Sequence, residues 1–312
     1  MNIVFFGSSN FALPSLKALL TGAHKISCVV TQPDKKGGRG LLLLETMVKT
    51  VAKEASLKIY QPYSVNIPEA IKLLRDLSPD LFVVIAYGQI LSKAILDIPK
   101  IFSINVHASL LPKYRGAAPI NWAIINGEKT TGITVIKMTK DMDAGQIILN
   151  KEVDINNDDT AISLEDRLSH LAAGLLLDSL KSIEKNNYNL TLQDENLVSF
   201  APKLKKEDGL INWNRSAQDI YNLIRGCLPW PGTFTYLKGR LLKIHRVKVT
   251  GSASQQVTKS AGEIIQVTKD GILVATGGDN LIIEELQIEG GRKMLVEEFI
   301  AGHKISQGEI LR

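Results

Sequence analysis

Short apolar runs alternate with amphipathic segments through the first two thirds of the chain. Apolar runs, several of them made almost wholly of Val, Ile, Leu and Phe, predict strands at 2–7, 25–32, 81–88, 102–107, 132–138 and 145–155. Helical spacing predicts helices at 14–22, 47–55, 68–77, 117–126 and 161–185. Strands without polar alternation suit a parallel sheet that is covered on both faces. The pattern therefore predicts a doubly wound α/β domain over roughly residues 1–189.

The pattern changes after the polar stretch at 186–196, which reads as a linker or a surface crossing. A short helix at 216–225 precedes alternating strands at 233–239, 240–249, 261–276 and 280–290. Turn residues such as Lys238-Gly239 and Asp270-Gly271 separate them. Short strands at this spacing are typical of a small antiparallel barrel. The sequence thus predicts two domains of different architecture.

Length and composition agree with a two-domain soluble protein. The chain has 312 residues, of which 45% are hydrophobic and 22% charged. No apolar run approaches the roughly 18–20 residues that span a bilayer, and no signal-peptide pattern follows Met1. The only cysteines, Cys28 and Cys227, argue against a disulfide framework and a zinc cluster. We therefore expect a cytoplasmic protein without membrane contact.

Positive charge gathers in one part of the chain. The net charge is +5, and residues 203–248 hold ten basic side chains against three acidic ones. Such a cluster is typical of a surface that binds a polyanion. A well-solvated surface without a partner explains it equally well. Composition alone leaves both interpretations open.

Polar side chains stand at the end of the predicted strand 102–107. Residues two apart on a strand face the same way, so Asn105 and His107 would project together. Ligands bind at the carboxyl ends of strands in open parallel sheets. An imidazole there can move a proton, and a carboxamide can donate to a developing oxyanion. Asp141 or Asp143, after the strand 132–138, could orient the imidazole and stabilise its charged form. Together these groups predict an acyl-transfer site.

Other chemistries fit these residues less well. Each residue taken singly could instead be a packed histidine, a capping Asn or a turn Asp. A serine hydrolase built on Ser109 would need the G-x-S-x-G elbow, which is missing around it. Asn is a poor metal ligand and no second His lies near His107 in the sequence. The turn after the first strand also lacks the G-x-G-x-x-G of dinucleotide-binding proteins.

Several segments, taken in order, resemble one known family. They are "FFGSSNFALPSL" (5–16), "TQPDKKGGRG" (31–40), "VVIAYGQIL" (83–91), "INVHASLLPKYRGAAPI" (104–120), "TGITVIKMTKDMDAGQII" (131–148), "FAPKLKKEDGLINW" (200–213) and "LIRGCLPWPG" (223–232). The chain resembles the methionyl-tRNA formyltransferases, a branch of the 10-formyltetrahydrofolate-dependent formyltransferase family. The resemblance implies a Rossmann-like catalytic domain at 1–189, a linker at 190–206 and an OB-like, tRNA-binding barrel at 207–312.

The resemblance also implies a reaction. Members of the family transfer a formyl group from 10-formyltetrahydrofolate to the free amino group of methionyl initiator tRNA. The product is formylmethionyl-tRNA, which serves translation initiation. The folate would be a co-substrate, with no permanently bound cofactor and no metal. We expect a monomer.

Site residues follow from the same resemblance, position by position. The catalytic trio would be Asn105, His107 and Asp143. Folate would bind at Ser109, Leu110, Leu111 and Pro112 and along the backbone that includes Ile85, Tyr87, Gly88 and Leu91. Arg39 matches the loop arginine that is expected to contact the tRNA acceptor stem. Its loop neighbours Lys35 and Lys36, and Lys203, Lys205, Lys206, Arg240 and Lys243 of the basic stretch, are expected to contact tRNA because of their charge.

Rival classes leave part of the sequence unexplained. Formyltransferases that act on a sugar nucleotide or on glycinamide ribonucleotide would not need ten basic residues at 203–248. An RNA-binding protein without enzyme activity would leave Asn105, His107 and Asp143 unused. A dinucleotide oxidoreductase lacks its glycine fingerprint and its ribose-binding acid here.

Overall fold

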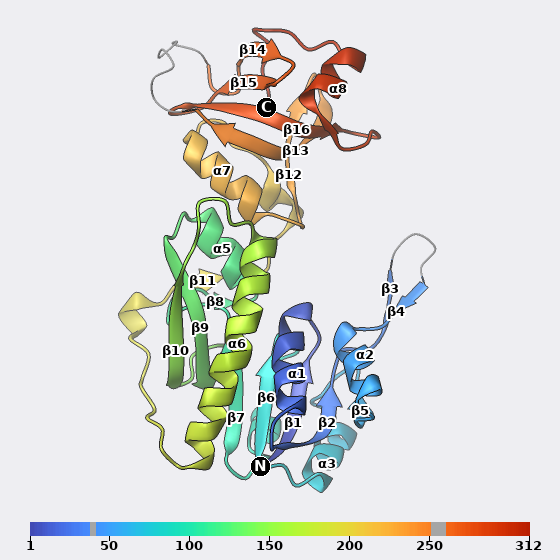
Figure 1. Cartoon of the computed structure of the whole chain (residues 1–312), viewed down its shortest axis with the longest axis vertical. Helices are drawn as coiled ribbons and strands as arrows, with labels where there is room; N and C mark the ends of the chain where they lie inside the picture. The colour runs from blue at the N-terminus through green and yellow to red at the C-terminus, as the bar shows by residue number, and fades with distance from the viewer. Residues whose placement is uncertain (38–41, 251–259) are drawn as a thin grey trace. The chain divides into compact units, whose positions relative to one another are not determined.

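The computed structural model describes residues 1–37, 42–250 and 260–312. The chain divides into two compact units. The first contains Met1–Pro119, Thr130–Asp154 and Leu164–Pro202, and the second contains Ile120–Lys129, Ile155–Ser163 and Lys203–Arg312. Each unit is built on a sheet of its own (Figure 1).

The first unit is built on a seven-stranded sheet in the order β10-β9-β7-β6-β1-β2-β5. The strands from β7 to β5 are parallel, whereas β9 runs antiparallel to both its neighbours. This arrangement confirms the predicted mainly parallel, doubly wound sheet. The strands are β1 (Asn2–Gly7), β2 (Lys25–Val30), β5 (Ile59–Tyr60), β6 (Leu81–Ile85), β7 (Phe102–His107), β9 (Thr130–Lys137) and β10 (Ile147–Asp154).

Both faces of the central strands are buried. Val4 and Phe6 of β1 pack with Leu74 in one core cluster. The alternate residues Ile3 and Phe5 have no exposed surface either. Figure 1 shows α1 and α6 lying across one face of the sheet. Burial on both faces explains why β1 and β6 are almost wholly apolar.

Most helices of this part of the chain lie close to the positions that the sequence predicts, whereas α4 and η1 were not predicted. Pro residues begin α3 and stand in the first turn of α1, where a missing N–H costs nothing. The helices of the first two thirds of the chain are α1 (Leu13–Leu20), α2 (Met47–Glu54), α3 (Pro68–Asp76), α4 (Lys93–Leu96), α5 (Pro119–Ile125) and α6 (Ala161–Glu184), with the 3-10 turn η1 (Asn10–Ala12). Two short pairs lie outside the main sheet: β3 (Lys35–Gly37) with β4 (Leu42–Leu44), and β8 (Arg115–Gly116) with β11 (Phe200–Ala201).

The strand predicted at 81–88 ends earlier, at Ile85. Ala86 has φ 45° and Gly88 has φ 86°, so the backbone leaves the extended region at once. The carbonyl of Ala86 accepts the backbone N–H groups of Ser8 and Ser9. The turn is therefore fixed against the end of β1 at the carboxyl edge of the sheet.

The second unit holds an antiparallel sheet in the order β12-β13-β16-β15-β14, with β17 beside β16. Its core contains Trp213, Ile244 and Phe299. The elements are the 3-10 turn η3 (Lys206–Gly209), α7 (Ala217–Gly226), β12 (Thr233–Leu237), β13 (Arg240–Val249), β14 (Ile264–Thr268), β15 (Gly271–Ala275), β16 (Asn280–Ile288), β17 (Met294–Leu295) and α8 (Val296–Gly302). The sequence did not predict β17 and α8.

The last residues of the chain join the two edges of this sheet. Arg312 exchanges backbone hydrogen bonds with Tyr236 of β12, and Leu311 donates its N–H to the carbonyl of Gly262 before β14. Isolated bridges join Leu311 to Leu237 and Ile310 to Glu263. The sheet thereby closes into the small antiparallel barrel that the sequence predicts.

The two compact units differ from the predicted domain limits in two ways. Residues 190–202, placed in the predicted linker, lie with the first unit, where β11 pairs with β8. Residues 120–129 and 155–163 belong to the second unit although the sequence places them in the first domain. None of the helices in the described parts of the chain is long and apolar enough to span a bilayer.

Candidate active site

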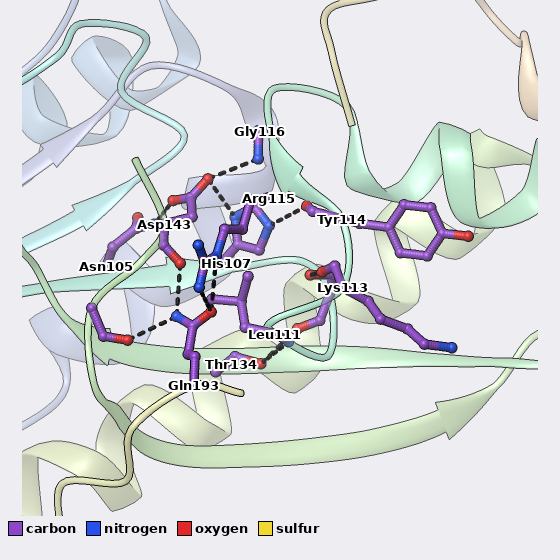
Figure 2. Close-up of polar contacts among 12 residues, drawn as sticks. Asn105, His107, Leu111, Lys113, Tyr114, Arg115, Gly116, Thr134, Asp143 and Gln193 are labelled. Atoms are coloured by element: carbon purple, nitrogen blue, oxygen red, sulfur yellow. Dashed lines mark hydrogen bonds and ion pairs between the residues drawn. The ribbon is translucent and has the colours of Figure 1, made fainter. Parts of the chain in front are cut away.

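Strand β7 brings two polar side chains to the same face of the sheet. Asn105 and His107 are two residues apart, as the sequence predicts, and His107 is buried with 6% of its surface exposed. Strand β9 lies beside them and pairs Ile136 with Asn105 and Thr134 with His107. The loop after β9 then carries Asp143 back to this face, so the structure brings all three residues together (Figure 2).

The imidazole of His107 has a defined orientation. Its Nε2 lies 2.9 Å from the backbone oxygen of Tyr114. A carbonyl oxygen can only accept, so Nε2 carries the hydrogen of this bond. In the neutral ring Nδ1 is then the nitrogen that can take up a proton. It lies 3.6 Å from a carboxylate oxygen of Asp143.

Asp143 joins the imidazole to the amide of Asn105. One carboxylate oxygen accepts from Asn105 Nδ2 at 3.1 Å, and the other accepts from the backbone N–H of Gly116 at 2.9 Å. A proton taken up at Nδ1 of His107 would face this carboxylate as an ion pair. The sequence predicts that an Asp orients the imidazole, and in the structure the Tyr114 carbonyl holds the ring as well, at Nε2. Asp141, the alternative to Asp143, is exposed, and its carbonyl accepts from the Thr139 hydroxyl in the loop.

The turn that carries Asp143 has an unusual backbone. Asp143 itself has φ 53°, in the left-handed region. A side chain at Gly145 would place its Cβ 1.8 Å from the carbonyl oxygen of Lys137, so only glycine fits there. The turn is therefore held close to the end of β9.

Gln193 and Arg115 support this turn from outside β7 and β9. Gln193 Nε2 donates to the carbonyls of Asp143 and Gly145 at 2.7 and 2.8 Å. Its Oε1 accepts from Nε and Nη2 of Arg115 at 3.0 and 2.8 Å. Arg115 also pairs with the exposed Glu195, and this hydrogen bond lowers the pKa of the Glu195 carboxyl. Gln193 lies just before the 3-10 turn η2 (Glu195–Leu197).

The predicted folate-binding turn is packed against β9. Ser109 Oγ donates to the carbonyl of Lys113 at 2.6 Å, and the N–H of Leu111 donates to Thr134 Oγ1 at 3.1 Å. Leu110 is partly exposed, and a cis peptide bond precedes Pro112. These contacts fix the loop that follows His107.

At the other predicted folate residues, the backbone faces a possible ligand, because most of the side chains are buried. Ile85, Tyr87 and Leu91 are buried, and Tyr87 and Leu91 pack in the core cluster of the sheet. Burial raises the pKa of the Tyr87 hydroxyl. Gly88, with φ 86°, lies in the turn between them. Any ligand at this edge would meet the backbone of 86–88.

The residues predicted to contact tRNA fall into two groups. In the first unit, Lys35 is exposed, Lys36 is in the β3–β4 pair, and Arg39 lies outside the described residues. In the second unit, all five of the predicted side chains are exposed: Lys203, Lys205, Lys206, Arg240 and Lys243. Among the described residues none of these five forms an ion pair with a carboxylate. Their charges are therefore available to an anionic partner.

A pocket of about 460 Å³ lies elsewhere in the first unit. Its lining includes Lys93, Asp97, Phe102, Lys137 and Lys140. Phe102 begins β7 and His107 ends it, so this pocket and the imidazole are at opposite ends of the strand. The pocket is separate from the Asn105–His107–Asp143 cluster.

Sequence reasoning missed the supporting residues of this cluster. Arg115 stands in the segment 104–120, where the resemblance gave it no role, and Gln193 lies in the predicted linker. The Tyr114 carbonyl is a backbone group and leaves no signal in a sequence. Within the described ranges, no group of three or more His, Cys, Asp or Glu is placed to hold a metal ion.

Comparison with protein families gives two matches that follow each other along the chain. Residues 1–180 match a family described as formyl transferase, and residues 203–304 match the formyl transferase C-terminal domain. Two similar relatives are named methionyl-tRNA formyltransferase. That of Citrifermentans bemidjiense is 46% identical over 311 residues, covering 100% of this chain and 96% of the relative. That of Acetivibrio thermocellus is also 46% identical and covers 100% of this chain and 99% of the relative.

Solved structures share the fold at low identity. A sugar 3N-formyltransferase, WlaRD, crystallised in the presence of dTDP and 5-N-formyl-THF, has a TM-score of 0.67 at 20% identity. The match covers 91% of this chain and 97% of that one. HypX from Aquifex aeolicus, in complex with tetrahydrofolic acid, has a TM-score of 0.63 at 14% identity, covering 99% of this chain and 50% of that one.

Proposed function

Since this chain belongs to the formyltransferase family, we propose that it transfers a formyl group from 10-formyltetrahydrofolate to the free amino group of methionyl initiator tRNA. The product is formylmethionyl-tRNA, used in translation initiation. One observation carries the proposal: the Nδ1 atom of His107 faces Asp143 beside the Asn105 amide. The acceptor follows from relatives named methionyl-tRNA formyltransferase, which are 46% identical over the whole chain.

The uncharged α-amine of methionine attacks the formyl carbon. A new C–N bond forms, and the carbonyl oxygen of the formyl group becomes an oxyanion. One N–H of the Asn105 carboxamide already donates to Asp143 at 3.1 Å, which leaves the second N–H for the oxyanion. The tetrahedral intermediate then collapses, breaking the bond between the formyl carbon and N10 of the folate.

His107 moves the proton between the two amines. Because Nε2–H is committed to the Tyr114 carbonyl, Nδ1 accepts the proton that the attacking amine loses. The resulting imidazolium is stabilised by the Asp143 carboxylate 3.6 Å away. Nδ1 then returns a proton to N10 of the departing tetrahydrofolate, which restores the neutral ring.

The two co-substrates would use different parts of the chain. The folate would lie against the backbone of 86–88 and the turn of Ser109, Leu110, Leu111 and Pro112. The tRNA phosphates would meet Lys203, Lys205, Lys206, Arg240 and Lys243, with Lys35, Lys36 and Arg39 toward the acceptor stem. The exposed charges of the five residues in the second unit favour this assignment. We further propose that the working form is a cytoplasmic monomer.

A comparison of formyl acceptors, each offered separately, tests the function. The protein is incubated with 10-formyltetrahydrofolate carrying a labelled formyl group and, in turn, with methionyl initiator tRNA, uncharged initiator tRNA, glycinamide ribonucleotide and a dTDP-linked amino sugar. We expect label only on the methionyl-tRNA. Transfer to the nucleotide or the sugar instead would assign the chain to another branch of the family.

A further inference from the structure

Gln193 bridges two consecutive parts of the turn that carries Asp143. Its Nε2 lies 2.7 Å from the Asp143 carbonyl and 2.8 Å from the Gly145 carbonyl. A primary amide has two N–H groups, and here one donates to each end of the turn formed by residues 143–145. The two bonds fix the backbone from which the Asp143 side chain projects.

The orientation of the Gln193 amide is determined by its neighbours. The guanidinium of Arg115 can only donate, so the atom it meets must be the amide oxygen. The two backbone carbonyls can only accept, so the atom between them must be the amide nitrogen. Arg115 is buried, with 6% of its surface exposed, and it is anchored on its other side by Glu195. Figure 2 shows the chain of contacts from Arg115 through Gln193 to Asp143.

This support decides where the Asp143 carboxylate lies. With φ 53°, Asp143 is in a region that most residues avoid, so its backbone conformation depends on such contacts. The carboxylate is positioned at 3.1 Å from Asn105 Nδ2 and 3.6 Å from His107 Nδ1. A shift of about 1 Å in a group of this kind can cost about a hundredfold in rate.

We infer that Gln193, held by Arg115, is a positioning residue for Asp143 in the transfer reaction. Gln193 lies beyond the matched N-terminal family region, which ends at residue 180, and in the segment predicted to be a linker. The segment after α6 therefore completes the site instead of only connecting two domains. The expected decrease in kcat rests on the proposed function. The expected displacement of Asp143 does not.

The decisive variant is Gln193→Glu. The carboxylate keeps the acceptor that Arg115 needs, so the buried guanidinium remains paired. It loses both N–H donors and sets oxygen against the carbonyls of Asp143 and Gly145. We expect kcat for formyl transfer to fall about tenfold to a hundredfold. KM for both co-substrates and the midpoint of thermal unfolding should stay close to those of the wild type.

A matched control lies next to it in the chain. Asp194 is exposed and accepts the backbone N–H of Asn196, which the variant Asp194→Asn can still do. This variant should have wild-type kcat. If Gln193→Glu lowers the unfolding midpoint by more than a few degrees, Gln193→Met replaces it, because that side chain has similar length and adds no charge. In that variant Arg115 loses the Gln193 acceptor and keeps its ion pair with Glu195.

A second readout does not depend on the reaction. The N–H of Gly116 donates to the Asp143 carboxylate at 2.9 Å. The backbone N–H groups of Arg115 and Ala118 donate instead to the carbonyls of Ser199 and Ala201, so they do not depend on Asp143. Hydrogen exchange at Gly116, followed by NMR, therefore reports whether Asp143 stays in place. We expect faster exchange at Gly116 in Gln193→Glu, with the amide of Arg115 unchanged.

The outcomes separate the two proposals. Lower kcat together with faster exchange at Gly116 supports the positioning role. Wild-type kcat and wild-type exchange in Gln193→Glu overturn it. If the wild type transfers no formyl group to methionyl-tRNA, the proposed function fails, and the exchange at Gly116 still decides whether Gln193 positions Asp143.

Discussion

The two regions assigned to the substrates are built in opposite ways. In the first unit, the side chains of His107 and Asp143 are 7% and 13% exposed, and each is held by hydrogen bonds to the backbone or to other side chains. In the second unit, the basic side chains of Lys203, Lys205, Lys206, Arg240 and Lys243 are exposed and form no ion pair in the described structure. One region is defined by geometry and the other by charge.

This difference has consequences for how each region responds to substitution. Catalytic groups stabilise the transition state directly, so removing one of them changes the rate by orders of magnitude. Phosphate contacts add up one by one and are screened by salt. Substitutions in the cluster of Asn105, His107 and Asp143 should therefore act on kcat, and those of the five exposed basic residues in the second unit on KM for tRNA.

After His107, the largest of the substitution effects is expected for Asn105→Ala. The variant removes the amide proposed to donate to the oxyanion, which commonly costs about 10²–10³ in kcat. Asn105 is partly exposed, so the fold should keep its thermal stability. Steady-state formylation kinetics measure the decrease in kcat, and a melting curve measures the thermal stability. Near-normal turnover in this variant would remove Asn105 from the mechanism.

Asp143→Asn should have the next largest effect. Asp143 accepts two N–H groups on two different oxygens, from Asn105 and from Gly116, and an amide offers only one oxygen. The variant also loses the charge that stabilises imidazolium at His107. We expect a decrease in kcat of about tenfold to a hundredfold, which corresponds to about 1.4–2.7 kcal/mol. An unchanged kcat would show that the carboxylate only supports the fold.

A smaller, graded effect is expected for the triple variant of Lys203, Lys205 and Lys206 to Ala. KM for methionyl-tRNA should rise while kcat stays the same, because these side chains are exposed and act through charge. The log-log salt slope of tRNA binding should fall by about 0.7–0.9 for each phosphate that the variant no longer neutralises. Filter binding at several salt concentrations measures it. An unchanged slope would place the tRNA on another surface.

The smallest effect should come from Lys93→Ala in the separate pocket. Lys93 is 77% exposed and pairs with Asp97, and such surface pairs contribute about 0–1 kcal/mol to stability. Kinetics should match those of the wild type within about twofold. A large change in kcat or KM would give the pocket a part in the reaction and would weaken the contrast between the two regions.

The features that the sequence predicted correctly are those that depend on the local pattern of apolar and polar residues. Strands β1 and β7 have the predicted limits: β1 is an apolar run that ends at Gly7, and β7 alternates apolar with polar residues and ends at His107. The spacing of Asn105 and His107 on β7 also follows directly from the strand period. The prediction failed at 86–88, where the left-handed backbone of Ala86 ends β6 without a glycine or proline at that position.

The supporting contacts of the site could not be read from the sequence. One group that orients His107 is a backbone carbonyl, which every residue has. Gln193 contacts Asp143 across 50 residues of sequence, in a segment whose polar composition predicts a linker. Such contacts depend on how distant segments meet in space, and a single sequence does not carry that information.

The most direct test of the central claim is a single-turnover measurement of formyl transfer from 10-formyltetrahydrofolate to methionyl initiator tRNA. The wild type is compared with His107→Ala at saturating concentrations of both co-substrates. If Nδ1 of His107 moves the proton, the rate should fall by about 10²–10⁴ while both co-substrates still bind. A variant that transfers the formyl group at the wild-type rate would contradict the assignment of this cluster as the catalytic site.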